Sequence, residues 1–213
     1  MEFLQRAAAL FWPERCVLCD DVVAYQACCC PRCRREAPFL EEPFRLGEIP
    51  VVAVWRYQGR VPEAIGRFKF HGDKDAGRGM ARLMAAAWRE LGPRTRPDCV
   101  TFVPMPPERE RQRGYNQARL LAQWVGEELE LPVLPLLRRE GVMMQHHLSA
   151  GARRKGVRKA YRLLPEGEEQ VPGKRVLLVD DVVTTGGTLG ACAGQLRQAG
   201  AKGVALLAVA SAG

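Results

Sequence analysis

Residues 176–188 read VLLVDDVVTTGGT, and this stretch decides the fold. The four apolar residues 176–179, bounded by turn signals, predict a buried parallel strand. Apolar residues recur at helical spacing from Leu189 onward, so a helix is expected to begin near Thr188 and to end at Gly200. A strand, a short loop and a helix N-terminus in this order form an anion site, because unpaired backbone N–H groups and the helix dipole converge on the loop.

The loop carries side chains that suit a phosphorylated sugar. Glycines admit a phosphate without a Cβ in the way, hydroxyls donate to it, and two adjacent carboxylates can accept from neighbouring ribose hydroxyls. The candidate ligand-binding residues are Asp180, Asp181, Thr184, Thr185, Gly186, Gly187 and Thr188. The stretch resembles the site at which type I phosphoribosyltransferases bind 5-phosphoribosyl 1-pyrophosphate. An ordinary β-turn-α unit would explain one glycine and one threonine but not the paired acids, and neither a Walker A loop nor a GxGxxG turn occurs.

The composition is that of a soluble globular protein. The chain has 213 residues, 47% hydrophobic and 26% charged, which is enough for one α/β domain and a small appendage. No apolar run reaches the ~18 residues of a membrane span. Residues 1–11 contain Arg6 and lack a small-residue cleavage site, so a docking helix is expected there instead of a signal peptide. The expected location is the cytoplasm, where eight cysteines point to metal binding before disulfides.

Basic residues gather in one part of the chain. The net charge is +8, and residues 138–162 hold eight Arg or Lys against a single acid. Such a basic segment predicts an anionic partner, either pyrophosphate or nucleic acid. Within this long polar stretch, which is typical of a lid or of disorder, Arg153 and Arg154 are candidates to face a pyrophosphate. His146 and His147 have no carboxylate or cysteine at ligand spacing, so metal binding by this pair is not expected.

Two CxxC pairs, ten residues apart, lie near the N-terminus. Paired knuckles of this kind supply four thiolates to a tetrahedral Zn²⁺, and a module too small for a core of its own needs that metal to fold. The expected ligands are Cys16, Cys19, Cys30 and Cys33. Cys28 or Cys29 could displace Cys30, but only Cys30 completes the second CxxC. We therefore predict a structural zinc.

A Pro- and Glu-bearing stretch, residues 38–50, is interpreted as a linker. It separates an N-terminal helix and zinc ribbon, residues 1–45, from a second domain, residues 46–213. In that domain strands are expected at 51–57, 100–103, 133–137, 176–179 and 204–209, and helices at 61–70, at 74–91 and from 118 onward. Buried strands that alternate with amphipathic helices predict an α/β fold. We expect a type I phosphoribosyltransferase-like, open and mainly parallel sheet with flanking helices.

Other loops are expected to reach the same ligand. In an open α/β sheet the loops after neighbouring strands meet at the carboxyl edge. The stretch 108–117 is interpreted as such a loop, which brings Arg113 and the backbone of Gly114 toward a pyrophosphate. Lys69, at the end of a predicted helix, is a further pyrophosphate-facing candidate, whereas His71 beside it is expected to be a solvated helix end.

Four segments follow the cysteine pairs in order: WRYQGRVPEAIGRFKFHGD, FVPMPPERERQRGYNQARLLA, QHHLSAGARRKGVRKAY and VLLVDDVVTTGGT. Through them the chain resembles the ComF (ComFC-type) family of bacterial competence proteins over nearly its whole length. The resemblance implies a ligand, 5-phosphoribosyl 1-pyrophosphate, bound with Mg²⁺. It also implies that Asp180 and Asp181 hold the ribose hydroxyls, that residues 184–188 hold the 5′-phosphate and that Arg113 faces the pyrophosphate. The implied role is natural transformation, in which the protein handles incoming single-stranded DNA with a competence helicase at the inner face of the membrane.

Two classes of function remain open from the sequence. An active phosphoribosyltransferase of nucleotide or amine metabolism needs an acceptor site, yet residues 208–213 lack the aromatic residue that a purine-salvage enzyme would use after its final strand. A binding protein would keep the phosphate cradle without turnover, while the basic segment follows a DNA strand. Tyr115 and Tyr161 are the only aromatic residues near that segment, so base stacking has weak support.

Overall fold

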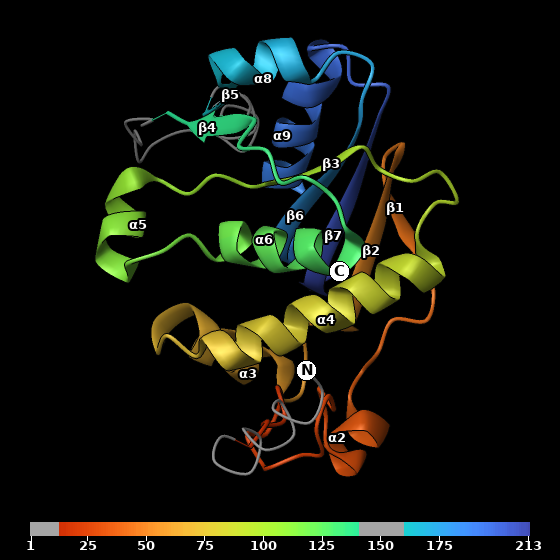
Figure 1. Ribbon diagram of the computed structural model, residues 1–213, viewed down its shortest axis with the longest axis vertical. Coiled ribbons are helices and arrows are strands. Elements are labelled where there is room, and N and C mark those ends of the chain that lie inside the picture. The colour runs from red at the N-terminus through yellow and green to blue at the C-terminus, as the bar shows by residue number, and fades with distance from the viewer. Residues whose placement is uncertain (1–12, 141–159) are drawn as a thin grey trace.

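A five-stranded sheet forms the centre of the computed structural model, which describes residues 13–140 and 160–213 (Figure 1). The strands are β1 Phe44–Leu46, β2 Ile49–Arg56, β3 Cys99–Phe102, β6 Arg175–Val183 and β7 Gly203–Ser211. They lie in the order β1-β2-β7-β6-β3. All neighbours are parallel except the short edge strand β1, which is antiparallel to β2. The predicted open, mainly parallel α/β sheet is confirmed.

Helices flank this sheet. They are α2 Pro31–Glu36, α3 Val61–Phe70, α4 Lys74–Leu91, α5 Pro107–Arg113, α6 Gln117–Leu129, α8 Pro165–Gln170 and α9 Gly187–Gln198. In Figure 1, α4 and α6 cross in front of the sheet, whereas α9 lies near α8 and a separate two-stranded pair. That pair consists of β4 Leu137–Arg139 and β5 Tyr161–Leu163. The helices expected at 61–70 and 74–91 are confirmed, because their apolar residues keep a strict helical spacing.

The core lies between the sheet and these helices. Residues 176–179 of β6 are each at most 1% exposed, as expected for a parallel strand covered on both faces. Trp55 of β2, Phe68 of α3 and Met80 of α4 are fully buried. Burial of this apolar surface fixes the strand ends, and the carboxyl edge of the sheet is therefore a rigid support for the loops that follow it.

The stretch 108–117, expected to be a loop, contains a helix instead. Two prolines precede Glu108, and Pro107 occupies the first helical position, where a fixed φ and a missing N–H favour helix formation. Gly114, with a φ of 83°, ends the helix in the left-handed region, which glycine adopts without strain. Arg113 thus lies in the last turn of α5 and not in an open loop.

The strand expected at 133–137 is not formed. Val133 makes one isolated bridge with Val100, and the next strand begins at Leu137 and pairs with β5 away from the main sheet. Pro132 precedes this stretch and Pro135 lies within it, and neither can donate a ladder hydrogen bond. The strand β5 and the helix α8, within residues 161–170, have no counterpart in the sequence-based expectations.

Two boundaries also differ from expectation. β6 continues to Val183, which is paired with Ser211 of β7, so Asp180 and Asp181 lie inside the strand and not after it. The stretch 38–50, interpreted as a linker, contains β1, and Phe39 forms a bridge with Trp55. The extension of β6 comes from pairing with β7, which is distant in the sequence, whereas β1 pairs with the adjacent strand β2 in a tight hairpin.

Several expectations lie outside the described residues. They concern the N-terminal docking helix, His146, His147, Arg153 and Arg154.

Candidate functional site

The turn between β6 and α9 is open to solvent at the point where an anion is expected. Gly186, with a φ of 70°, precedes the first residue of the helix, Gly187, and has no side chain to cap it. Thr184 and Thr185 are exposed, and Thr188 is half-buried in the first turn. The first N–H groups of the twelve-residue helix α9 therefore face the same region as three hydroxyls. This turn, residues 184–188, is called the phosphate turn below.

The paired acids lie on β6, two residues before the phosphate turn. The N–H of Asp181 donates to Oδ1 of Asp180 at 2.9 Å. Nζ of Lys69, from the last turn of α3, lies 2.8 Å from Oδ1 of Asp181. The two side chains of this ion pair are only 20% and 14% exposed, so water screens their interaction less than at the surface. The structure therefore brings together Asp180, Asp181 and Lys69, which are far apart in the sequence.

Lys69 balances only one of the two carboxylates. Burial raises the pKa of Asp180, and the negative charge of Asp181 raises it further. The hydrogen bond from the Asp181 N–H and the charge of Lys69 lower the pKa only in part, so it is about 8. A ligand that donates hydroxyl hydrogens to Asp180 would favour its charged form, as would an added cation.

The RGYNQA segment turns out to be largely structural. Asn116 caps α6 by accepting from the N–H of Arg119, and its Nδ2 donates to the carbonyl of Val103, just after β3. The hydroxyl of Tyr115 donates to the carbonyl of Phe68 in α3, and the two rings pack together. These contacts join the β3 edge of the sheet to the end of α3. Sequence reasoning missed them because they are long-range.

Arg113 does not lie free near the ligand region. Its guanidinium stacks on the ring of Phe70, the last residue of α3, with Cζ 4.7 Å from the ring centre. Phe70 directly follows Lys69, the partner of Asp181. Arg113 and the acids thus belong to one end of α3 and of the sheet, although no contact between Arg113 and the acids is present in the described residues. His71, which follows Phe70, is exposed, as expected.

Tyr161 of β5 is a further residue beside the phosphate turn. Burial raises the pKa of Tyr161, and the neighbouring side chain of Thr188 lowers it in part. The guanidinium of Arg139 lies over the Tyr161 ring, with Cζ 5.4 Å from its centre. Sequence reasoning named Tyr161 only as a stacking candidate. Because Tyr161 is 2% exposed, it cannot stack with an external base.

A second candidate site lies in the N-terminal part. The sulfur atoms of Cys16, Cys19, Cys30 and Cys33 all lie within 4.8 Å of one another. The Sγ atoms of Cys19 and Cys30 are 3.7 Å apart, close to the ~3.8 Å edge of a tetrahedron with metal–sulfur bonds of about 2.3 Å. Although burial alone would raise it, backbone hydrogen bonds lower the pKa of Cys16 to about 7, which favours the thiolate. The residues present fit a tetrahedral metal ion, and Cys28 and Cys29 are not part of this set.

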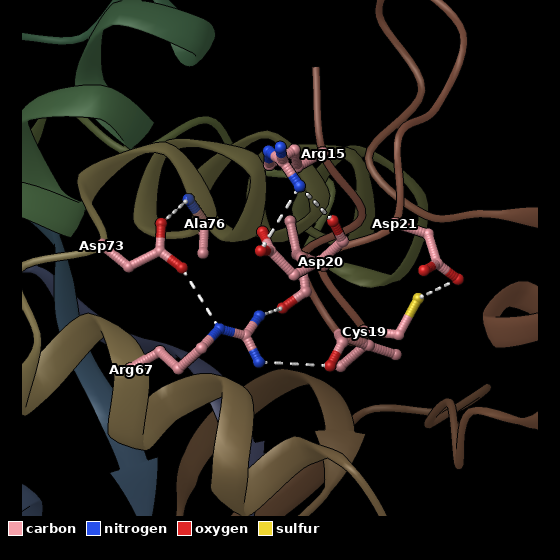
Figure 2. Close-up of polar contacts among 9 residues, drawn as sticks. Arg15, Cys19, Asp20, Asp21, Arg67, Asp73 and Ala76 are labelled. Atoms are coloured by element: carbon pink, nitrogen blue, oxygen red, sulfur yellow. Dashed lines mark hydrogen bonds and ion pairs between the residues drawn. The ribbon is translucent and has the colours of Figure 1, made fainter. Parts of the chain in front are cut away.

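Arg67 connects the cysteine cluster with α3 (Figure 2). Its Nη2 donates to the carbonyl of Val17 at 2.9 Å and its Nη1 to that of Leu18 at 3.4 Å. Its Nε also pairs with Asp73 at 3.2 Å, and Asp73 caps α4 by accepting from the N–H of Ala76. Val17 and Leu18 lie between the first two cysteines. One helix therefore contacts the metal-site backbone through Arg67 and the acid pair through Lys69.

With this geometry described, comparisons with known proteins identify the family. Residues 137–213 match the family described as "Phosphoribosyl transferase domain". Over 203 residues the chain is 32% identical to "Competence protein F" of Haemophilus influenzae, and the match covers 92% of this chain and 84% of that protein. The chain belongs to the ComF family.

Other relatives agree with this ComF membership. "DNA utilization protein YhgH" of Salmonella typhimurium is 32% identical over 200 residues, covering 87% of this chain and 85% of the relative. "Competence protein ComFC" of Bacillus subtilis is 28% identical over 142 residues, covering 64% and 53%. Among solved structures, glutamine phosphoribosylpyrophosphate amidotransferase from B. subtilis is 24% identical to this chain, with a TM-score of 0.43. The match covers 61% of this chain and 25% of that structure. This similarity is too low to indicate a ligand. No helix in residues 13–140 or 160–213 combines the length and hydrophobicity of a membrane span.

Proposed function

We propose that this ComF protein binds 5-phosphoribosyl 1-pyrophosphate at the carboxyl end of β6 and acts in natural transformation. The proposal rests on one observation: the acid pair lies close to the phosphate turn. Only two residues separate Asp180 and Asp181 from the start of this turn. The acids would accept from the ribose hydroxyls. The N–H groups and hydroxyls of residues 184–188 would hold the 5′-phosphate.

Cations of α3 and α5 suit the opposite end of this ligand. Lys69 already neutralises Asp181, and Arg113 has no carboxylate within ion-pair distance among the described residues. The backbone of Gly114, together with Arg153 and Arg154 from the basic segment, completes the proposed pyrophosphate-facing set. Mg²⁺, bound with the pyrophosphate, would supply the remaining positive charge. At the four cysteines we infer a structural Zn²⁺, since a closed set of four thiolates is typical of structural zinc.

The test exchanges the acid pair for amides. We expect Asp180→Asn with Asp181→Asn to weaken 5-phosphoribosyl 1-pyrophosphate binding at least about a hundredfold, since each charge-assisted hydrogen bond contributes about 1.5–3 kcal/mol. Titration calorimetry in the presence of Mg²⁺ measures the affinity, and circular dichroism checks the fold. A matched control, Glu41→Gln with Glu42→Gln, makes the same carboxylate-to-amide exchange at an exposed pair of adjacent acids. Equal affinity of the acid-pair variant and the control would refute the ribose-binding role.

Turnover is a second candidate function, and the unpaired guanidinium of Arg113 favours it. If pyrophosphate leaves C1 of the ribose, the leaving group gains negative charge, which a nearby cation stabilises. The acceptor would be a nucleobase or an amine, as in salvage or amine metabolism. Pyrophosphate release from 5-phosphoribosyl 1-pyrophosphate, measured with and without a panel of nucleobases and amines, tests this candidate. Binding without release in every mixture would leave a binding protein, not an enzyme.

The DNA role rests on the basic segment, residues 138–162, and on the names of the relatives. We propose that the segment follows incoming single-stranded DNA and that a competence helicase is the partner in the cytoplasm, at the inner face of the membrane. Five of its cations are Arg153, Arg154, Lys155, Arg158 and Lys159. Five phosphate contacts predict a log–log salt slope of roughly −3 to −4 for single strands. A salt titration of DNA binding should give a flatter slope when all five are neutralised; identical slopes would exclude the segment from DNA handling.

A further inference from the structure

Phe70 is the most exposed large apolar side chain in residues 13–140 and 160–213. It is 68% exposed at the end of α3, compared with 60% for Val22 and 40% for Tyr57. The neighbouring aromatic residue of the same helix, Phe68, is fully buried. Leaving a phenyl ring in water forgoes the free energy that its burial would provide. The face of this ring that Arg113 does not cover is therefore available for an external contact.

The exposed ring is held in a defined orientation. The Arg113 guanidinium lies 4.7 Å from the centre of the Phe70 ring, in cation–π geometry. Both residues come from helix ends that are fixed to each other, because Tyr115 donates to the carbonyl of Phe68 and packs on its ring. Arg113 is half-buried and, within the described residues, has no carboxylate partner. The pair thus presents an oriented aromatic surface beside an uncompensated positive charge.

The position of the pair relates it to the candidate ligand site. Phe70 directly follows Lys69, whose Nζ lies 2.8 Å from Oδ1 of Asp181. Arg113 ends α5, in the connection that follows β3, and β3 is the neighbour of β6 in the sheet. The pair therefore lies at the carboxyl edge of the sheet, the same edge at which β6 presents its acids.

We propose that Phe70 and Arg113 form a stacking platform for a nucleobase. The phenyl ring offers a π-face to the base, and the guanidinium offers a cation to the phosphate of the same nucleotide. The two aromatic residues that the sequence suggested for stacking, Tyr115 and Tyr161, are engaged internally instead. The proposal deepens the proposed function and rests on it, because the nucleobase would belong either to a DNA strand or to a free nucleotide used at the adjacent site.

The experiment measures the contribution of the bases to binding separately from that of the phosphate charges. The probes are a short oligothymidylate and an abasic deoxyribose-phosphate chain of equal length, which carries the same phosphates without bases. We expect the wild-type protein to prefer the oligothymidylate. Phe70→Leu should weaken its binding about fivefold or more, which corresponds to the low end of the loss per stacked base, and leave the abasic chain unaffected. Phe70→Trp should keep the preference, since its side chain retains a π-face.

A matched control is Val22→Ser, which removes another exposed apolar side chain, in the N-terminal part, and should change neither probe. Thymidine monophosphate, used as a competitor, distinguishes the two sources of the base: competition indicates a mononucleotide site, and its absence indicates a DNA strand. Equal loss for both probes in Phe70→Leu, or no base preference in the wild type, would overturn the platform. Calorimetry with 5-phosphoribosyl 1-pyrophosphate, run on the same proteins, reports the proposed function separately, because Phe70→Leu leaves the acids intact.

Discussion

The two candidate sites of this ComF protein differ in the buried residues that hold them in place. In the N-terminal cysteine module, residues 13–37, the buried residues are Cys16, Val17, Leu18, Cys30 and Cys33, so three of the five are expected metal ligands. At the phosphate turn, the support is a β6 strand whose residues 176–179 are buried among other apolar side chains. Expected metal ligands thus make up most of the buried side chains of the module. The phosphate turn, in contrast, is supported by buried apolar side chains that bind no ligand.

This difference predicts a different response to ligand loss. A module that is stabilised mainly by metal bonds should unfold without them, because binding free energy is then folding free energy. A loop that is supported by a sheet should keep its shape when the ligand dissociates. Helix α3 contacts both sites, through Arg67 and Lys69, whereas α4 contacts the module through the ion pair of Arg82 with Glu14.

The largest effect is expected from loss of the metal site. Cys33→Ser removes a buried ligand, and structural zinc contributes on the order of 10 kcal/mol to such modules. We expect the zinc content to fall to near zero and the first 37 residues to become sensitive to protease, while 5-phosphoribosyl 1-pyrophosphate affinity changes less than about tenfold. Elemental analysis, limited proteolysis and calorimetry measure these three quantities.

Cys28→Ser is the matched control, because Cys28 is half-buried and lies outside the four-sulfur cluster. It should retain zinc and protease resistance. Zinc loss in the control instead of in Cys33→Ser would assign the ligands differently. Complete loss of ligand binding in Cys33→Ser would show that the two sites are not independently supported.

The next effect concerns the connection between the sites. Arg67→Met removes two hydrogen bonds to the carbonyls of Val17 and Leu18 and the ion pair with Asp73, whose side chains are only 21% and 23% exposed. We expect unfolding in urea to show a loss of about 2–4 kcal/mol. After zinc chelation the loss should shrink to about 1 kcal/mol, because only the contact with Asp73 would remain. An equal loss with and without chelator would mean that Arg67 does not couple module and sheet.

The contrast between the sites also explains what the sequence could predict. The cysteine spacing and the 176–188 stretch are local signals, and helices α3 and α4 follow from the periodicity of their own residues. The contacts that orient the sites are long-range. Arg67 reaches residues about fifty positions away, and Tyr115 donates to Phe68 across a comparable interval. No local pattern marks either contact.

Other features of the structure are not evident from short stretches of the sequence. The stretch 108–117 is interpreted as a loop, although Pro107, directly before it, occupies the first position of a helix. The end of β6 could not be located because its extension to Val183 depends on pairing with β7. The exposure of Phe70, in contrast, agrees with the helical spacing, because Val61, Ala64, Ile65 and Phe68 recur at i, i+3, i+4 and i+7, and Phe70 lies off that face.

A smaller effect should appear in the pH dependence of stability. Because the pKa of Asp180 is raised to about 8 in the folded protein, chiefly by burial and then by the charge of Asp181, the folded state holds a proton that the unfolded state has lost. Between roughly pH 4 and pH 8 the free energy of unfolding therefore falls as the pH rises. Asp180→Asn lacks this titration and should be relatively more stable at high pH.

The measurement is the free energy of unfolding of both proteins between pH 5 and pH 9. One unit of pKa elevation corresponds to about 1.4 kcal/mol, so the wild type should lose at least about that amount relative to Asp180→Asn across this range. Titrations of groups distant from Asp180 cancel in the comparison, whereas the pKa values of Cys192 and of Tyr161 are raised by burial and also by the charge of Asp180. Parallel pH profiles of the two proteins would show that the carboxyl group of Asp180 ionises as it does in an exposed site.

The smallest effect is expected at the contact between β5 and the phosphate turn. Tyr161→Phe removes the hydroxyl that interacts with the side chain of Thr188 but keeps the ring on which Arg139 lies. A neutral hydrogen bond contributes about 0.5–1.5 kcal/mol, so stability should fall by no more than about that amount. If Tyr161 orients the Thr188 hydroxyl toward the 5′-phosphate, affinity for 5-phosphoribosyl 1-pyrophosphate should also fall about threefold.

A double-mutant cycle decides whether Tyr161 acts through Thr188. Thr188→Val removes the hydroxyl that Tyr161 is expected to orient, so adding Tyr161→Phe to that variant should cause no further loss of affinity. Tyr57→Phe is the control, since Tyr57 is 40% exposed and follows β2 instead of β5. Additive losses in the cycle would assign Tyr161 a purely structural role. The conformation of the phosphate turn would then be set by β6 and α9 alone. In that case no side-chain contact would orient the turn, whereas the cysteine module depends on its metal-ligating side chains.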